Sequence, residues 1–120
     1  MATIKAYTDL SQSKTLSKIL PLDSADMNYW CGTQIRIGGH KTMDKDLDVP
    51  CWSLAALLSV IPKRIKDYNI LRIDINEKDT AIWYDEIGYG VNNDLPDITK
   101  DNPIDACYEL ILKLNELKML

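Results

Sequence analysis

The stretch NILRIDINEKDTAIWYDEI, residues 69–87, decides the fold. Residues 69–76 alternate between apolar and polar side chains, which is the period-two pattern of a half-buried strand. The polar run at residues 76–79 predicts a hairpin loop, and residues 80–87 predict the returning strand. This stretch is therefore expected to form an antiparallel hairpin with one apolar face.

Helices are predicted before and after this hairpin. A first helix is expected to begin at Asp9, with Gln12 at the capping-box position, and to end at Pro21, because the residue before proline resists helical dihedrals. The segment PCWSLAALLSVIP, residues 50–62, has proline in its first turn and again at its end. This segment is apolar nearly all round, so we expect a second helix buried against a sheet.

The last helix has the clearest pattern. Asn102 is expected to cap it and Pro103 to occupy the first helical position. Apolar residues then recur at helical spacing, at Cys107, Leu110, Ile111, Leu114 and Leu117. Such a stripe predicts a helix with one face packed on a core.

Shorter elements complete the predicted fold. Residues 33–37 are β-branched and alternate, which predicts a strand, and residues 3–7 predict a short opening strand. Residues 22–30 are expected to be irregular or one helical turn, and residues 40–48 a loop. We expect an α+β fold in a single domain, residues 1–120, with a small antiparallel sheet of three to five strands packed against three helices.

Composition limits the classes of function. The chain is 46% hydrophobic and 27% charged, as in globular proteins, and its formal net charge is −4. This charge argues against binding DNA through its phosphates, because that mode requires a basic face. The opening MATIKAYTDL has no apolar secretory segment, and no run approaches the ~20 apolar residues that span a bilayer. Three irregularly spaced cysteines predict a reduced, cytoplasmic protein without disulfides.

The sequence shows no catalytic or metal-binding signature. His40 is the only histidine, and there is no nucleophile elbow, Walker loop or HExxH pattern. The aspartates in residues 44–48 resemble the opening of a calcium loop, but Val49 occupies the position of its required glycine. We therefore predict a protein that is not an enzyme and uses no metal or cofactor. An enzyme with a pair of carboxylates in a cleft is the alternative, since the chain has 18 acidic residues.

The segment IRIGGHKT, residues 35–42, is the main candidate for a binding site. A strand that ends in Gly38 and Gly39 exposes backbone N–H groups, which can form an anion-binding nest. The side-chain donors suited to phosphate in this segment are Arg36, His40, Lys41 and Thr42. The same residues also fit an ordinary hairpin turn with a polar tip, and glycine pairs mark turns more often than sites.

Two pairs of adjacent aromatic residues complete the candidate site. They are Tyr29–Trp30 and Trp83–Tyr84. Neighbours on a strand point to opposite faces, so each pair is expected to place one ring in the core and one at the surface. An exposed Trp30 or Trp83 would offer a stacking platform for a base, with Arg72 nearby, whereas burial of both tryptophans is the alternative.

Three segments carry a resemblance to known proteins. They are QSKTLSKILPLDSADM (residues 12–27), PCWSLAALLSVIP (residues 50–62) and DNPIDACYELILKLNELKML (residues 101–120). With these segments the chain resembles a family of small uncharacterised proteins from phages, prophages and mobile elements of gut Bacteroides-type bacteria. The resemblance covers most of the chain, is looser over residues 69–93 and brings no catalytic residues with it. It implies an accessory protein in a bacterial host cell that counters host defence.

Two functional hypotheses follow. In the first, the protein sequesters a small anionic immune signal, such as a cyclic nucleotide or an ADP-ribose-like molecule. Its pocket would combine residues 35–42 with an exposed aromatic side chain and Arg72, between the protomers of a homo-oligomer. In the second, the chain is an interaction module that inhibits or adapts a host or phage protein, and an exposed apolar patch is expected on the hairpin of residues 69–87. Neither hypothesis involves DNA or a membrane.

Overall fold

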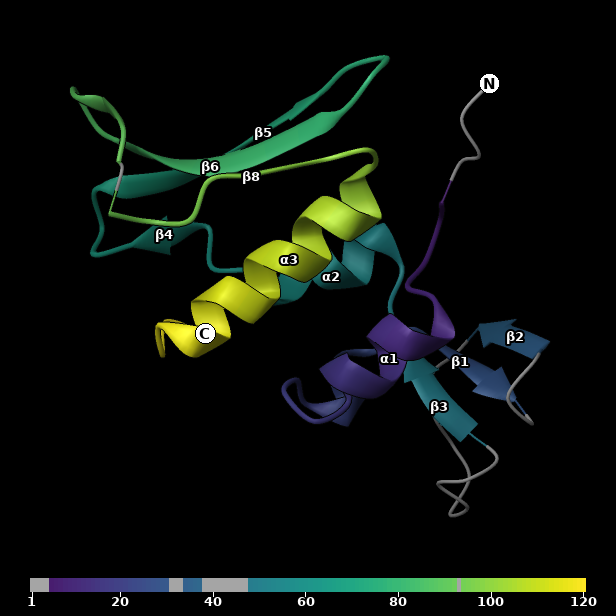
Figure 1. The fold of residues 1–120 in the computed structure, drawn as a ribbon. Helices are drawn as coiled ribbons and strands as arrows, with labels where there is room; N and C mark the ends of the chain where they lie inside the picture. Colours follow the sequence, from purple (N-terminus) through teal and green to yellow (C-terminus); the bar gives the residue numbers. More distant parts are fainter. Residues whose placement is uncertain (1–4, 31–33, 38–47, 93) are drawn as a thin grey trace. The chain divides into compact units, whose positions relative to one another are not determined.

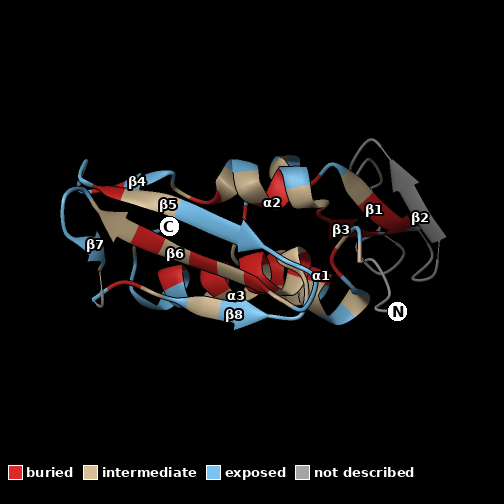
Figure 2. Ribbon diagram, turned by 90° about the horizontal axis from the view of Figure 1, so that it is seen from above, coloured by how far each residue is buried: buried red, intermediate tan, exposed pale blue. Residues whose placement is uncertain are grey.

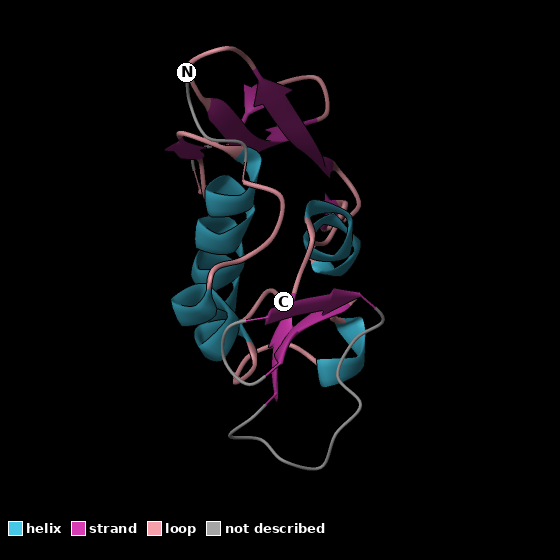
Figure 3. Ribbon diagram, turned by 90° about the vertical axis from the view of Figure 1, so that its right-hand side faces the viewer, coloured by secondary structure: helices cyan, strands magenta, loops and turns pink. Residues whose placement is uncertain are grey.

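The computed structural model divides the chain into two compact units. The described residues are 5–30, 34–37, 48–92 and 94–120, of which residues 30, 34–37 and 48 are described by their backbone alone. The N-terminal unit is Lys5–Val60, and the C-terminal unit contains Ile61–Leu120. The predicted α+β class is confirmed, with two separate antiparallel sheets in place of the single predicted sheet (Figure 3). No described helix is long and apolar enough to cross a membrane.

Within its described residues, the N-terminal unit contains three strands and three helical segments. In chain order these are α1 (Leu10–Leu16), the 3-10 helix η1 (Leu22–Ser24), β1 (Met27–Trp30), β2 (Gln34–Ile37), β3 (Asp48–Cys51) and α2 (Leu54–Val60). Strand β1 is central and pairs antiparallel with β2 on one side and β3 on the other. The strand predicted at residues 33–37 is confirmed. Residues 22–30 do contain a helical turn, η1, but they end in the unpredicted strand β1.

The first helix begins as predicted. The Asp9 carboxylate accepts a hydrogen bond from the Gln12 N–H at 2.8 Å, and Gln12 Oε1 accepts one from the Asp9 N–H at 3.1 Å. These two bonds complete a capping box. Helix α1 ends at Leu16, and a turn over residues 17–20 separates it from Pro21. The helix is therefore shorter than the sequence predicted.

The core of the N-terminal unit gathers around β1 and β3. Its buried members are Tyr29, Val49 and Cys51, with Tyr7, Leu10 and Met27 packed against them. The Tyr29 hydroxyl donates to the Thr8 carbonyl at 2.8 Å, and the Thr8 hydroxyl accepts from the Trp52 N–H at 3.2 Å. These buried polar groups are thus satisfied, as a stable core requires.

The prediction of one continuous helix over residues 50–62 is wrong. Pro50 belongs to β3, and α2 begins only at Leu54. β3 lies at the edge of its sheet, where a strand tolerates proline because the missing N–H can face outward. The Ser53 hydroxyl then accepts a hydrogen bond from the Ala56 N–H at 3.2 Å, which starts the helix after the strand.

The C-terminal unit combines a five-stranded sheet with one long helix (Figure 1). Its elements are β4 (Arg64–Ile65), β5 (Asn69–Ile75), β6 (Thr80–Glu86), β7 (Gly90–Val91), β8 (Ile98–Lys100) and α3 (Pro103–Glu116). Strand β6 is central, with β5 along one side and both β7 and β8 along the other. Strands β4 and β8 are only 2 and 3 residues long, and the sequence predicted neither.

The predicted hairpin of β5 and β6 is confirmed. The two strands pair antiparallel over their full length, so that Arg72 lies directly opposite Trp83. Asn76 closes the turn, because its side-chain oxygen accepts two backbone N–H groups of the loop at 2.9 and 3.0 Å. The following turn, around Tyr89, uses Gly88 and Gly90 at φ of +85° and +82°, a conformation that favours glycine.

Helix α3 packs against β6 and β8 and builds the core of the C-terminal unit. Asn102 caps it as predicted, because its side-chain oxygen accepts the Asp105 N–H at 2.9 Å. Four members of the predicted stripe are fully buried, namely Cys107, Leu110, Ile111 and Leu114. Leu117 is 47% exposed, because α3 ends one residue before it. The buried and exposed faces of the sheet and helix are distinguished in Figure 2.

Candidate functional site

The predicted anion-binding segment falls largely outside the described residues. This applies to Gly38, Gly39, His40, Lys41 and Thr42. Arg36 and Trp30 are placed by their backbones alone, Arg36 opposite Asn28 in β2 and Trp30 opposite Gln34 at the end of β1. The phosphate cradle therefore stays a prediction. Among the nine predicted site residues, the structure describes the side chains of Arg72 and Trp83.

Arg72 and Trp83 do come together, through an acidic residue that the sequence did not single out. Arg72 Nε lies 3.3 Å from Asp85 Oδ2, in an ion pair. Trp83 Nε1–H donates to Asp85 Oδ1 at 2.8 Å. Asp85 thus uses both carboxylate oxygens to hold the two side chains. The charge of Arg72 is compensated within the protein, which weakens it as a phosphate ligand.

The adjacent pair Trp83–Tyr84 splits between the two faces of the sheet, as predicted. Tyr84 is fully buried, and its hydroxyl donates to the Pro62 carbonyl at 2.7 Å. Trp83 is partly exposed on the other face, which it shares with Asp85 and with its register partner Arg72. We call this second face the open face of the C-terminal sheet.

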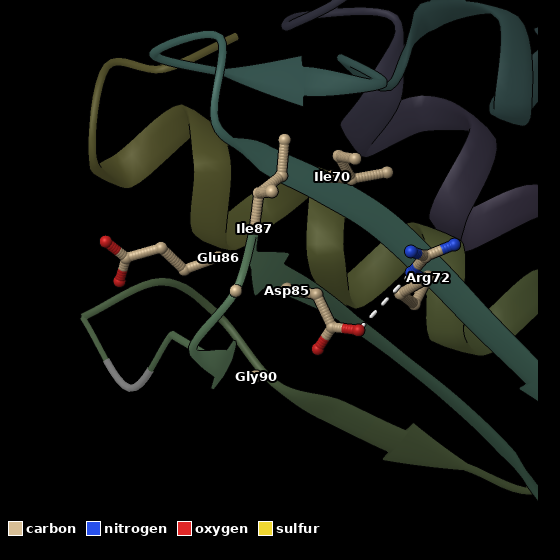
Figure 4. Close-up of a pocket in the computed structure, with 7 residues that line it drawn as sticks. Ile70, Arg72, Asp85, Glu86, Ile87 and Gly90 are labelled. Atoms are coloured by element: carbon tan, nitrogen blue, oxygen red, sulfur yellow. Dashed lines mark hydrogen bonds and ion pairs between the residues drawn. The ribbon is translucent and has the colours of Figure 1, made fainter.

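A hollow of about 320 Å³ lies on the open face near the β6–β7 turn (Figure 4). It is lined by Ile70, Arg72, Asp85, Glu86, Ile87, Gly88 and Gly90. Isoleucine side chains give it an apolar wall, and the Arg72–Asp85 ion pair borders it. The sequence could not indicate this hollow, because its lining comes from three strands and a turn whose register sets their proximity.

Four large apolar side chains are exposed at the same end of the sheet, and we call them the apolar rim. They are Tyr68, Ile87, Tyr89 and Val91, with exposed fractions of 46%, 53%, 83% and 47%. The Ile87 N–H donates to the Tyr68 carbonyl at 2.8 Å, which joins the β4–β5 and β6–β7 turns. Val91 lies opposite Asp85, beside the hollow. Large apolar side chains that gather at one place on a surface indicate an interaction site.

A second hollow, of about 300 Å³, lies between the segment before β8 and the end of α3. Its charged lining residues are three acids, Asp94, Asp97 and Glu116, and one base, Lys113. Lys113 Nζ lies 3.8 Å from Glu116 Oε2, so part of this charge is neutralised. Within the described part of the chain, no three His, Cys, Asp or Glu side chains are grouped so that they could hold a metal ion.

The two described cysteines are not activated nucleophiles. Burial raises the pKa of the Cys107 thiol to about 12. Burial also raises the pKa of Cys51, although hydrogen bonds from Thr8 and Ser13 oppose this shift. Both thiols therefore stay protonated near neutral pH, whereas a catalytic cysteine needs a lowered pKa. Cys107 acts as a small buried apolar group, whereas the buried Cys51 thiol also donates a hydrogen bond to the Thr8 carbonyl.

No protein-family model, curated protein or solved structure matches the chain. Its function is therefore inferred from its own geometry. The features that bear on function are the hollow, the apolar rim and the compensated Arg72, all within the C-terminal unit.

Proposed function

We propose that the chain is a protein-binding module and that the apolar rim and its adjoining hollow form the binding surface. The observation that carries this proposal is the grouping of Tyr68, Ile87, Tyr89 and Val91, each about half exposed or more, around an isoleucine-lined hollow. Exposed tyrosines beside a pocket are typical of protein-binding surfaces, because a rigid ring offers large contact area with little loss of conformational entropy.

The charge of the hollow favours a protein side chain over a phosphate group. Two acidic residues, Asp85 and Glu86, line it beside one basic residue, Arg72. An anion would meet this excess of negative charge, because Arg72 already pairs with Asp85. An apolar side chain of a partner would instead cover the isoleucine wall, at ~25 cal/mol for each Å² of apolar surface removed from water.

The resemblance noted for the sequence adds an expectation about the partner. Some small phage accessory proteins bind and block a host protein, whereas others sequester nucleotide signals, so the proposed partner is a host or phage protein. The proposed role is inhibition or adaptation of that protein without catalysis. Sequestration of a nucleotide-like anion by residues 35–42 stays a separate prediction.

Site-specific photo-crosslinking in the bacterial host tests the proposed surface. A photoreactive amino acid replaces Tyr89 in the apolar rim, and in a matched control it replaces Leu22, an exposed apolar residue of the N-terminal unit. We expect one discrete crosslinked protein from position 89, absent from position 22. Adding Ile87→Ser should reduce that crosslink by about tenfold, since a central interface residue contributes 1 kcal/mol or more.

Three results would contradict the proposal. The first is the same set of crosslinked products from positions 89 and 22. The second is a discrete product that Ile87→Ser leaves unchanged. The third is a crosslinked dimer of the chain itself, which would assign the apolar rim to self-association.

A further inference from the structure

Strand β5 has an edge that no described strand covers. Strand β4 pairs with β5 only at Asn69 and Ile70, and Leu71 makes the last hydrogen bond on that side, from its N–H to the Lys63 carbonyl at 3.0 Å. Beyond Leu71 the described residues place no strand beside β5. Natural proteins rarely leave such an edge both open and apolar, because it can pair with another chain.

The backbone N–H and C=O groups of Ile73 and Ile75 point outward from this edge of the sheet. In an antiparallel pair, the N–H and C=O groups of successive residues face alternate sides. Since the Leu71 N–H points toward β4, the backbone groups of Ile73 and Ile75 point the same way, where β4 is absent. These two residues thus offer two donors and two acceptors, spaced as an added antiparallel strand needs them.

The side chains along this edge follow an apolar, acidic, apolar pattern. Ile73 and Ile75 are 37% and 57% exposed on one face of the sheet. Asp74 lies between them on the open face, is exposed, and has no ion-pair partner among the described residues. An added strand would therefore match this edge best with an apolar residue, a basic residue and a second apolar residue in succession.

A second copy of this chain fits the edge poorly. Two-fold pairing that sets Ile73 against Ile75 of the second copy places Asp74 directly opposite Asp74 of that copy, and like charges in that position are destabilising. Pairing that sets Ile73 against Ile73 of the second copy moves Ile75 of that copy onto the place opposite Leu71. Lys63 already occupies that place. Both of these registers therefore disfavour pairing of the edge with a second copy of the chain.

We infer that the free edge of β5 binds an extended segment of a partner protein, which adds as an antiparallel strand with a lysine or arginine opposite Asp74 and apolar residues opposite Ile73 and Ile75. The added strand takes the direction of every other pairing in this sheet, all of which are antiparallel. Backbone hydrogen bonds supply the affinity and the alternating side chains supply the specificity. This inference rests on the proposed protein-binding function but uses none of the apolar-rim residues.

Binding of two capped, fluorescent peptides to the full chain tests the inference. The first contains Thr-Val-Lys-Val-Thr and the second Thr-Val-Glu-Val-Thr. We expect the lysine peptide to bind saturably, with a dissociation constant below about 1 mM, and the glutamate peptide to bind about fivefold more weakly. With Asp74→Lys this order should reverse, because the charge opposite the peptide's central residue has changed sign. Peptide addition should also slow amide hydrogen exchange at Ile73 and Ile75.

A proline variant isolates the contribution of backbone hydrogen bonds to peptide binding. Ile73→Pro removes an N–H that points away from β6, so the β5–β6 ladder keeps its hydrogen bonds. We expect this variant to bind the lysine peptide about tenfold more weakly, while the matched control Ile73→Val, which keeps the N–H, binds within about twofold of the unmodified chain. The far-ultraviolet circular dichroism spectrum checks that each variant is folded.

Four results would overturn the inference: no saturable binding, equal binding of both peptides, slowed exchange at residues outside β5, or a dimer of the unliganded chain held through Ile75.

The variant Ile87→Ser separates this inference from the proposed function. It should reduce crosslinking from the apolar rim by about tenfold and leave peptide binding at β5 unchanged. Loss of peptide binding in Ile87→Ser would place the peptide on the rim and also overturn the inference.

Discussion

Trp83 and Tyr84 are neighbours in sequence, yet they lie on opposite faces of the C-terminal sheet, and these two faces have different roles. Tyr84 lies on the face of β6 that carries the core and is fully buried, with its hydroxyl bonded to the Pro62 carbonyl. Trp83 lies on the open face, partly exposed, and its indole N–H is bonded to Asp85. A single strand thus supports a packed interior on one side and a patterned surface on the other.

The comparison of these two faces separates stability from recognition. On the covered face, Ile82 and Tyr84 of β6 are fully buried, and their burial contributes hydrophobic free energy to the unit, whereas Ile73 and Ile75 at the edge of this face stay partly exposed. The open face carries an ion pair, a hollow and the apolar rim. The exposed apolar side chains of the rim are in unfavourable contact with water in the isolated chain. Substitutions on the covered face should therefore change unfolding, and those at the open end should change binding.

The largest effect is expected from the covered face. Leu110→Ala leaves a cavity beneath the sheet, because Leu110 is fully buried on α3. We expect the free energy of unfolding to fall by about 2–5 kcal/mol, the range for leucine-to-alanine changes in packed cores. Chemical denaturation by urea, followed by circular dichroism, measures this loss.

The matched control for this variant is Leu117→Ala, because Leu117 directly follows α3 and is 47% exposed. It should cost less than about 1 kcal/mol, since exposed apolar side chains add little to stability. Equal losses for Leu110→Ala and Leu117→Ala would mean that α3 does not cover the sheet as described. The distinction between the two faces would then fail.

An intermediate effect on the free energy of unfolding is expected from raising the pH, through a buried thiol of α3. Burial raises the pKa of Cys107 from 9.0 to about 12 in the folded chain. Its contribution to stability is fully present below pH 9 and is lost as the pH rises toward 12, because the unfolded chain releases the thiol proton first. We expect the free energy of unfolding to fall by about 1 kcal/mol for each pH unit above that point.

Urea titrations in the presence of a reductant, at about pH 8.5 and about pH 10, test this dependence. This pH range limits the contribution of unperturbed tyrosines, which titrate only near its upper end. The control variant Cys107→Ala should show a smaller fall between the two values. It should not show a flat profile, because burial also raises the pKa of Cys51. Identical falls in the two proteins would show that Cys107 ionises as easily when folded as when unfolded.

The sequence was sufficient for elements whose signals are local. The β5–β6 hairpin, the capping box at Asp9 and the capped start of α3 at Asn102 each follow from residues within a few positions of one another. Pro50 led to the wrong prediction of a helix over residues 50–62, and the reason is physical. A proline before an apolar run favours a helix start, but it equally fits an edge strand, and the pairing partner of that strand lies more than twenty residues away along the chain.

The candidate site was harder to predict, because it depends on register. Asp85 had no local feature that marked it, and its role follows from lying beside Arg72 and Trp83 on paired strands. The apolar rim likewise joins Tyr68 to Ile87 through a hydrogen bond between two turns. The open edge of β5 could not be predicted either, because it depends on β4 beginning only at Arg64.

The smallest effect on stability is expected at the apolar rim. Ile87→Ser replaces a side chain that is 53% exposed and follows the end of β6, so it should change the free energy of unfolding by less than about 0.5 kcal/mol. Thermal and urea denaturation, compared with the unmodified chain, measure this change. If the variant instead lost as much stability as Leu110→Ala, Ile87 would belong to the core. The rim would then be a packing feature, and binding lost with Ile87→Ser could no longer be attributed to recognition.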